Sequence, residues 1–257
     1  SRGMTYKAAM ANLPLGGGKA VLIGDPRHDK SPSLFHAFGE FIERLNGRYI
    51  TAEDVGTSVE DMLSIKEATS HVVGLPGGSG DPSPFTAFGI FEAMRAAVLY
   101  RLGKHSLHGI RVAVQGLGNV GYNLCKILAE AGAELIISDL DPERVKRAVK
   151  EFKATPVSSE AIFSVEAEIF APCAMGAVIN DQTILQLKCL IIAGSANNQL
   201  ATPEHGDMLT KINILYAPDY VVNAGGLINV SHEGPHYNAD IVKAHVEGIY
   251  ETLLEVF

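Results

Sequence analysis

The chain has 257 residues, of which 47% are hydrophobic and 19% are charged. This length and composition are typical of a globular protein with one large domain or two modest ones, and they exclude the disordered and fibrous classes. The formal net charge of −8 at pH 7 argues against nucleic acid or an anionic membrane as a partner, because such partners require a basic face.

The sequence carries no recognisable targeting or membrane signal. Its apolar runs stay short of the roughly 18 residues that a membrane-spanning helix needs, and the first residues have no signal-peptide pattern. We therefore expect a cytoplasmic protein. Position 1 is Ser rather than Met, and residues 251–257 stop inside a helical pattern without a cap. We expect the sequence to be a piece of a longer protein.

The first functional signal is a lysine beside a run of glycines. Lys19 follows Gly16, Gly17 and Gly18 and precedes the apolar run 20–23. A short apolar run bounded by glycines predicts a buried strand, so Lys19 is expected where a loop enters a strand. The glycines would let a small ligand approach the backbone and would expose N–H groups that hold a carboxylate. A flexible turn with a surface lysine is the alternative, and these residues leave both readings open.

Two further charged residues are expected near this glycine loop. Lys7 lies on a short helix expected over residues 4–11, and Asp54 follows a strand expected over residues 48–52. A turn or capping role is common for Asp in such a setting. Ligands of open α/β sheets, however, bind beyond the carboxyl ends of parallel strands, which would place Asp54 and Lys19 at one cleft. Both roles stay open.

A boundary divides the chain after these elements. Apolar residues at helical spacing predict a helix over residues 31–45, which we interpret as structural. Residues 75–84 are dense in Gly, Pro and Ser, and a long helix is expected over residues 85–102. We place the domain junction and a hinge in this segment.

Residues 110–139 show the pattern of a dinucleotide-binding unit. Strands are expected over residues 110–114 and 134–138, with a glycine turn and a helix over residues 122–131 between them. An acidic residue follows the second strand. A lone GxGxxG motif is weak evidence, but strand, turn, helix, strand and acidic residue in this order are specific.

Each glycine of this turn has a separate role. Gly116 permits the tight turn, Gly118 lets the backbone approach the pyrophosphate, and Gly121 lets helix and strand pack closely. The N–H groups at the start of the helix are available to the phosphates. The residues expected to contact the cofactor in this unit are Gly116, Gly118, Asn119, Val120, Gly121 and Asp139.

The acidic residue indicates which cofactor is used. Asp139 would accept hydrogen bonds from the adenosine ribose hydroxyls and repel a 2′-phosphate, which favours NAD over NADP. Asp141 is a competing carboxylate, but Pro142 beside it indicates that Asp141 caps the following helix.

Three more strands are expected in the second half, over residues 168–171, 190–193 and 212–215. Each runs into a loop of small or polar residues, as a dinucleotide cleft requires. Ala174, Asn197 and Asn198 lie in these loops and are further candidates for cofactor contacts; for the two asparagines a turn role is the alternative. The alternation predicts an α/β fold with a Rossmann-type, doubly wound cofactor domain.

His232 to His236 read HEGPH and match the zinc peptidase pattern HExxH. That pattern works only when both histidines project from one face of an unbroken helix. Gly234 and Pro235 break such a helix, and no third ligand is evident, so we expect no metal site.

Seven motifs together give the sequence a family resemblance. GMTYKAAMANLPLGGGK, TAEDVGTSVEDM, GDPSPFTAFG, GLGNVGYNL, APCAMGAVIND, AGSANNQL and APDYVVNAGGLINV occur in this order along the chain. With them the sequence resembles the Glu/Leu/Phe/Val dehydrogenase family over essentially its whole length, and it is most similar to the leucine-acting members. The resemblance implies a smaller α/β substrate domain of the dimerisation type beside the cofactor domain, with a cleft between them. It also implies NAD-linked oxidative deamination of an L-amino acid to its 2-oxo acid and ammonia.

The resemblance also implies residue roles. Lys19 would be the catalytic lysine and Asp54 the catalytic acid/base. Lys7 would bind the substrate carboxylate, aided by the glycine loop Gly16 to Gly18. Thr86 would approach the nicotinamide.

Leucine-type specificity would depend on an apolar pocket, for which Ala52, Leu227 and Val230 are the matching positions. A glutamate substrate is disfavoured because no group at these positions would hold a second carboxylate. Val73 stands where the leucine-acting members are expected to have threonine, and the loop 75–84 looks shorter. Both departures border the pocket, so valine, isoleucine and aromatic amino acids stay open.

The sequence thus predicts residues 1–80 as the substrate domain, 81–232 as the NAD-binding domain and 233–257 as a C-terminal helix. The resemblance implies a homo-oligomer that acts on a small molecule, without nucleic acid or membrane. A non-catalytic NAD-binding protein is the competing class, against which the intact lysines and aspartate argue.

Overall fold

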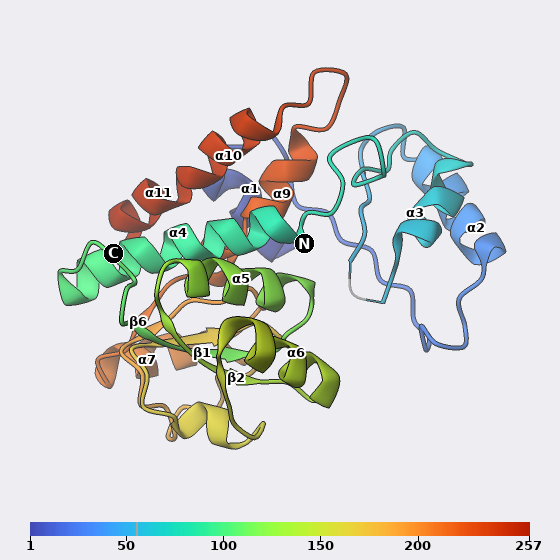
Figure 1. The fold of residues 1–257 in the computed structure, drawn as a ribbon. Helices are drawn as coiled ribbons and strands as arrows, with labels where there is room; N and C mark the ends of the chain where they lie inside the picture. The colour runs from blue at the N-terminus through green and yellow to red at the C-terminus, as the bar shows by residue number, and fades with distance from the viewer. Residues whose placement is uncertain (55) are drawn as a thin grey trace.

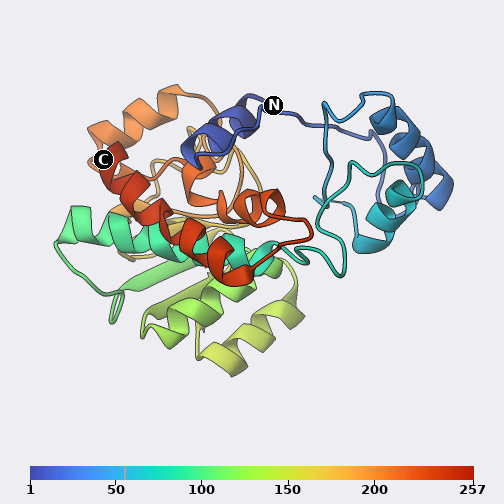
Figure 2. The ribbon, with the colours of Figure 1, turned by 90° about the horizontal axis from the view of Figure 1, so that it is seen from above.

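The computed structural model describes residues 1–54 and 56–257. These residues form a large α/β body and a smaller body that contains α2 and α3, set to one side (Figures 1 and 2). The chain passes between the bodies in the segment after α1 and returns in the segment before α4.

The large body is built on a parallel sheet of six strands in the order β3-β2-β1-β4-β5-β6. Its strands are β1 Arg111–Gln115, β2 Glu134–Ser138, β3 Thr155–Pro156, β4 Ile169–Pro172, β5 Ile191–Ile192 and β6 Leu215–Tyr216. β1 pairs with β2 on one side and with β4 on the other. The strand order therefore reverses beside β1, and this switch point is where doubly wound sheets bind ligands. The predicted Rossmann-type fold is confirmed.

The sheet differs from the sequence prediction at its two edges. β3 was not expected, because its two residues, Thr155 and Pro156, give no apolar run. The last strand, expected over residues 212–215, is formed by Leu215 and Tyr216 instead. Ile212 is the C-cap of α7 and is 50% exposed, and Asn213 adopts a left-handed φ of 64°, so the chain turns before it enters the sheet.

Alternate residues of the strands face two separate cores, as parallel strands covered on both faces require. Val112 and Val114 of β1 face the core that contains α4 and α5, whereas Ala113 faces the core that contains α7. The same alternation in β4 places Ile169 and Phe170 in different cores.

The helices of the large body are α4 Ser83–Leu102, α5 Asn119–Glu130, α6 Pro142–Phe152, α7 Glu204–Lys211, α8 Asp219–Val222, α9 Gly225–Ser231, α10 Ala239–Glu247 and α11 Ile249–Val256. The expected long helix is confirmed as α4, which packs against α5, α9, α10 and α11. Half of its residues are buried because it is covered on several sides. Among the described residues, no helix is both long and apolar enough to cross a membrane.

α1, Arg2–Met10, comes first in the chain but packs on the large body. It lies against α8, where the rings of Tyr6 and Tyr220 are 5.5 Å apart, and Ala11 joins the main core. Lys7 is therefore presented from the α/β side of the molecule.

The smaller body packs α2, Pro32–Glu43, against α3, Val59–Lys66. Its core is small and consists of Phe35, Ile42, Met62, Ile65, Val72 and Leu75. Ser31 caps α2 with its hydroxyl, and Pro32 occupies the first helical position, so the helix expected over residues 31–45 begins where a cap and a proline favour it.

The strand expected over residues 20–23 is wrong. That run has no strand conformation, and Val21 and Ile23 are 80% and 102% exposed. The strand expected over residues 48–52 is reduced to one parallel bridge between Thr51 and Val72. An apolar run becomes a strand only when a neighbouring strand satisfies its backbone groups, and in the part of the chain that the structure describes no strand pairs with residues 20–23.

Candidate active site

Lys19 and Asp54 meet in the structure, although 35 positions separate them. The Lys19 ammonium donates a short hydrogen bond to Asp54 Oδ2, and the two side chains are 43% and 45% exposed. Burial lowers the pKa of Lys19. The pair therefore combines a carboxylate with an ammonium that gives up its proton more readily than a surface lysine does.

Asp54 begins a turn, in which the Thr57 N–H donates to the Asp54 carbonyl at 2.9 Å, but another residue caps the helix that follows. The N-cap of α3 is Ser58, which forms a capping box with Asp61. The backbone of Asp54 is held by Thr57, whose hydroxyl donates to the Asp54 carbonyl at 2.7 Å and accepts from the Asp54 N–H at 2.9 Å. The Asp54 side chain is thus presented to Lys19 from a fixed backbone.

The glycine loop before Lys19 is required for packing. A Cβ at Gly17 would lie 2.2 Å from the Ser1 carbonyl oxygen, and a Cβ at Gly18 would lie 2.7 Å from the Tyr49 ring. Gly16 has no atom within 4 Å of such a Cβ. Two of the three glycines therefore allow the loop to lie against its neighbours, and Gly16 leaves open space.

Lys7 lies in the same region as Lys19, on the opposite body. Burial lowers the pKa of Lys7 from 10.5 to about 8; the charge of Asp219 opposes this shift and the charge of Lys19 adds to it. Lys7 Nζ donates to Asn197 Oδ1 at 3.1 Å. The two ammonium groups thus lie close enough for the charge of one to act on the other, and neighbouring positive charges favour an anionic ligand.

Two residues that the sequence analysis did not identify hold in place the loop that carries Asn197 and Asn198, called here the asparagine loop. Asn223, which is 5% exposed, donates to Asn197 Oδ1 at 2.8 Å and to the Ser195 carbonyl at 2.9 Å. Asp219 accepts from the backbone N–H of Asn198 at 2.5 Å. Both residues follow β6 at the carboxyl edge of the sheet. Ligands of such sheets bind at this edge, so that position could have identified both residues from the sequence.

The glycine turn after β1 has the geometry that its sequence predicts. Gly116 has a φ of +98°, and a Cβ there would lie 2.9 Å from Ala174 Cβ. A Cβ at Gly121 would lie 2.0 Å from the Gly116 carbonyl oxygen. At Gly118 the nearest atom to such a Cβ is Arg144 Nη1, 4.0 Å away, so the space beside this residue is open.

The same turn fits a bound phosphate. α5 starts at Asn119, followed by Val120, and its N-cap Gly118 offers no side-chain cap to the first N–H groups. Uncapped N–H groups at a helix N-terminus beside open space form an anion site.

Asp139 has structural partners that the sequence did not reveal. Its carboxylate accepts from the Leu117 N–H at 2.6 Å and from the Asp141 N–H at 2.8 Å, and Arg144 Nη1 lies 3.9 Å away. Asp139 thereby fixes the glycine turn to the end of β2. Asp141 caps α6, as predicted, by accepting from the Glu143 N–H at 2.9 Å.

The apolar pocket positions lie where the bodies face each other. Leu227 and Val230 are three residues apart on α9 and are partly exposed, and Ala52 follows the bridge residue Thr51. A Cβ at Gly74 would lie 3.9 Å from Val230 Cγ1, which brings the segment after Val72 to this helix.

Thr86, on the first turn of α4, lies against the start of α9. A Cβ at Gly226 would be 2.5 Å from Thr86 Oγ1, and that hydroxyl donates to the Pro82 carbonyl at 3.0 Å. α4 and α9 therefore pack closely at the site where Thr86 was expected to contact the cofactor.

The HEGPH motif lies between α9 and α10 rather than on a helix. His232 pairs with His245 at 3.0 Å between Nε2 and Nδ1, and His245 Nε2 is 2.8 Å from the Ala11 carbonyl oxygen. Across residues 1–54 and 56–257, no group of three or more His, Cys, Asp or Glu side chains is arranged to hold a metal ion.

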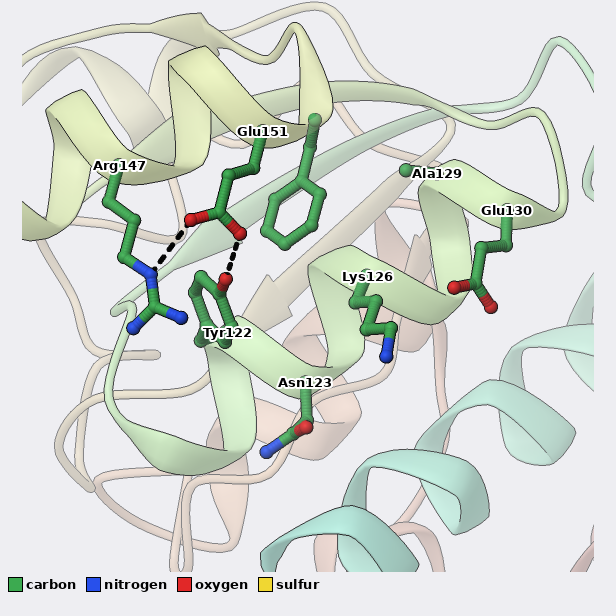
Figure 3. A pocket seen from close by; sticks show the side chains of 8 residues that line it. Tyr122, Asn123, Lys126, Ala129, Glu130, Arg147 and Glu151 are labelled. Atoms are coloured by element: carbon green, nitrogen blue, oxygen red, sulfur yellow. Dashed lines mark hydrogen bonds and ion pairs between the residues drawn. The ribbon is translucent and has the colours of Figure 1, made fainter.

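A separate hollow of about 560 Å³ lies between α5 and α6. Figure 3 shows that Tyr122, Arg147 and Glu151 line it, and Glu151 accepts hydrogen bonds from the other two. None of the expected cofactor or substrate residues lines this hollow, so it is distinct from the candidate site.

Family models of known proteins match most of the chain. The family model described as "Glu/Leu/Phe/Val dehydrogenase, dimerisation domain" matches residues 1–71, and that described as "Glutamate/Leucine/Phenylalanine/Valine dehydrogenase" matches residues 77–142 and 137–242. The chain is 56% identical to a leucine dehydrogenase of Thermoactinomyces intermedius over all of this chain and 71% of that protein. It is 48% identical to a phenylalanine dehydrogenase of Bacillus thermotolerans over all of this chain and 69% of that protein.

A solved structure shares the fold as well. The L-tryptophan dehydrogenase from Nostoc punctiforme superimposes with a TM-score of 0.83 at 48% identity, over 99% of this chain and 74% of that one.

Proposed function

We propose that this chain, which belongs to the Glu/Leu/Phe/Val dehydrogenase family, catalyses the reversible NAD-linked oxidative deamination of a branched-chain L-amino acid. The observation that carries the proposal is the contact between Lys19 and Asp54, with the ammonium of Lys7 close enough for the charge of Lys19 to act on it. Identity of 56% to a leucine dehydrogenase over the whole chain supports the amino acid class.

The Lys19–Asp54 pair supplies the proton transfers. Asp54 takes a proton from the substrate ammonium, and the α-carbon then loses its hydride to give an iminium. Lys19, whose pKa burial lowers, deprotonates the water that attacks this iminium and stabilises the developing oxygen charge. Asp54 then returns its proton to the nitrogen of the carbinolamine that the water has formed. As the carbon–nitrogen bond breaks and ammonia leaves, the hydroxyl proton passes back to Asp54 and the 2-oxo acid is formed. The contact between the two groups lets a proton pass from one to the other.

Lys7 orients the substrate. Its ammonium donates one hydrogen bond to Asn197, and an ammonium has three donors, so the others can bind the substrate carboxylate. The backbone N–H groups of the glycine loop Gly16 to Gly18 would add to this contact. Fixing the carboxylate places the α-carbon for reaction and contributes mainly orientation.

The residues around the glycine turn fit NAD, which when bound accepts the hydride. The N-terminus of α5 and the open space at Gly118 would hold the pyrophosphate. Asp139 would receive the adenosine ribose, while Thr86, Ala174 and Asn198 would border the nicotinamide end. Arg144 is the residue that could instead favour a 2′-phosphate, because its guanidinium lies 3.9 Å from Asp139.

The partly exposed residues Ala52, Leu227 and Val230 support an aliphatic or other apolar substrate side chain. The second candidate is an aromatic substrate, which the relatives named phenylalanine and L-tryptophan dehydrogenase favour. The dimerisation description of residues 1–71 supports a homo-oligomer. The gap between the matched segments, residues 72–76, supports a division of the chain near residue 80.

The test is NADH formation with a panel of L-leucine, L-valine, L-isoleucine, L-phenylalanine, L-tryptophan and L-glutamate, with NAD and NADP compared. We expect turnover with NAD that is highest for the branched-chain substrates and is lost in Lys19→Ala. A preference for an aromatic substrate would replace the branched-chain assignment. Cofactor binding without turnover of any substrate would refute the enzymatic proposal.

A further inference from the structure

The glutamate of the HEGPH motif ties two distant segments together. Glu233 follows α9, yet its Oε2 accepts from the Gly74 N–H at 2.7 Å and from the Ser79 N–H at 3.2 Å, 159 and 154 positions away. The Ser79 hydroxyl also donates to Oε2 in a short hydrogen bond. One carboxylate therefore satisfies three donors from both ends of a single loop.

This loop, residues 74–80, is rich in glycines with left-handed backbone conformations, although Leu75 anchors its start in the small core. Gly74, Gly77 and Gly80 adopt φ values of +82°, +86° and +66°, and a glycine-rich segment loses more conformational entropy on ordering than other segments do. A Cβ at Gly78 would lie 2.6 Å from Glu233 Oε1. The loop thus wraps closely around the carboxylate.

A neutral contact adds to the charged one. The fully buried Asn229 of α9 donates to the Ser79 carbonyl at 3.2 Å and accepts from the Tyr237 hydroxyl at 2.7 Å. Ser79 therefore attaches the loop to the segment 229–237 in two ways: its N–H and hydroxyl donate to Glu233, and its carbonyl accepts from Asn229.

The loop lies at the proposed side-chain pocket. It follows Val73, whose N–H donates to the Thr51 carbonyl at 2.9 Å, next to Ala52. At its start, a Cβ on Gly74 would be 3.9 Å from Val230 Cγ1. The same α9 segment therefore carries one wall of the pocket and holds the loop that forms the facing wall.

We infer that Glu233 is a positioning residue that fixes loop 74–80 as a wall of the amino acid side-chain pocket, and so sets the affinity and preference for the substrate side chain. The inference rests on the proposed function for its kinetic consequence. The hydrogen bonds of Glu233 described above all go to loop 74–80, so we assign it no part in the proton transfers. An ionised acceptor is needed because hydrogen bonds to a carboxylate are stronger than those to a neutral amide.

The kinetic test compares Glu233→Gln with the parent and with Glu255→Gln, which alters an exposed glutamate on α11. In Glu233→Gln we expect the KM of the preferred amino acid to rise by about tenfold. We expect the kcat and the KM of NAD to change by less than about twofold, and the ratio of kcat/KM between L-leucine and L-phenylalanine to shift. Glu255→Gln should leave all of these values unchanged.

A second variant, Ser79→Ala, keeps the test valid if Glu233→Gln fails to fold. It removes one hydrogen-bond donor to the carboxylate and leaves the Glu233 side chain unchanged. It should raise the same KM by a smaller factor. An unchanged amino acid KM and an unchanged substrate ratio in both folded variants would overturn the inference, as would an equal loss of kcat and NAD affinity.

Hydrogen exchange separates this inference from the proposed function, because it needs no turnover. The amides of Gly74 and Ser79 should exchange about tenfold faster in Glu233→Gln than in Glu255→Gln. Faster exchange in a protein that turns over no amino acid would support the loop anchor while refuting the enzymatic proposal. Equal exchange in the two variants would overturn the anchor itself.

Discussion

The two bodies of the molecule show how differently an apolar run behaves with and without neighbours. Ile137 of β2 is fully buried between β1 and β3. Ile23 belongs to an equally apolar run but is 102% exposed and outside any strand. Both runs predict a strand from their sequence. The difference lies in the neighbours. Each parallel strand of the large body is brought back by a helix or loop to pair with another strand, whereas no strand among the described residues pairs with residues 20–23.

The bodies also divide the proposed chemistry. Lys19 and Asp54 come from the segments around α2 and α3, while the glycine turn and the asparagine loop come from the sheet. Lys7 is presented from the large body toward the first pair. This division predicts that substitutions at Lys19 or Asp54 alter turnover, whereas substitutions in the sheet and glycine turn of the large body alter cofactor binding and stability.

The largest expected effect is on turnover. Lys19→Ala should lower kcat by about 10²–10⁴-fold, because it removes the proton acceptor and leaves Asp54 without this partner. NAD affinity, measured by isothermal titration calorimetry, should stay within about twofold, since the glycine turn is on the other body. A loss of NAD affinity as large as the loss of kcat would contradict the division between the bodies.

The next effect compares the two isoleucines directly. Ile137→Ala should lower the free energy of unfolding by about 2–5 kcal/mol, because it opens a cavity in a closed core. Ile23→Ala should change it by less than about 0.5 kcal/mol, because the side chain is exposed. Urea denaturation of both variants measures the contrast, and a large cost at Ile23 would show that its run is covered in solution.

The glycine turn offers a matched pair with a smaller cost. Gly121→Ala should lower stability by about 1–3 kcal/mol, since its Cβ would meet the Gly116 carbonyl at 2.0 Å. Gly118→Ala should cost under about 1 kcal/mol, since the nearest atom to its Cβ is Arg144 Nη1 at 4.0 Å, which is ordinary van der Waals contact. Both should weaken NAD binding. Equal thermal stability of the two variants would show that the turn is looser than its geometry indicates.

The smallest effect is a pH dependence at Lys7. Its pKa is lowered to about 8, so the ammonium that would bind the substrate carboxylate is lost as the pH rises through 8. The KM of the amino acid should therefore rise several-fold between pH 7 and 9, by up to about tenfold per pH unit. Lys7→Arg should abolish the rise, because arginine stays charged. A KM that is independent of pH in the parent would contradict this role.

The same shift affects stability in the opposite direction. Between about pH 8 and 10.5 the unfolded chain keeps its proton on Lys7 while the folded chain releases it. The unfolded state then binds more protons, so this group makes the free energy of unfolding rise with pH across that window. Below about pH 8 both states are protonated, and the burial penalty of the charged group is fully present.

The sequence by itself determined the features that depend on neighbouring residues. The unit from β1 to Asp139, the cap of α6 at Asp141 and the long helix α4 are all read from local patterns, because turns, caps and helix periodicity are satisfied within a few residues. The meeting of Lys19 with Asp54 was predicted only as one of two readings.

Only the tertiary structure decided the features in which distant backbone groups find their partners. Nothing local marks Glu233 as the acceptor for Gly74, 159 positions earlier, or Asn223 as the donor that holds Asn197. Nor does the run 20–23 reveal that it lies outside the sheet. The physical reason is the same in each case: a backbone donor or acceptor must be satisfied, but the sequence near it does not say by which group.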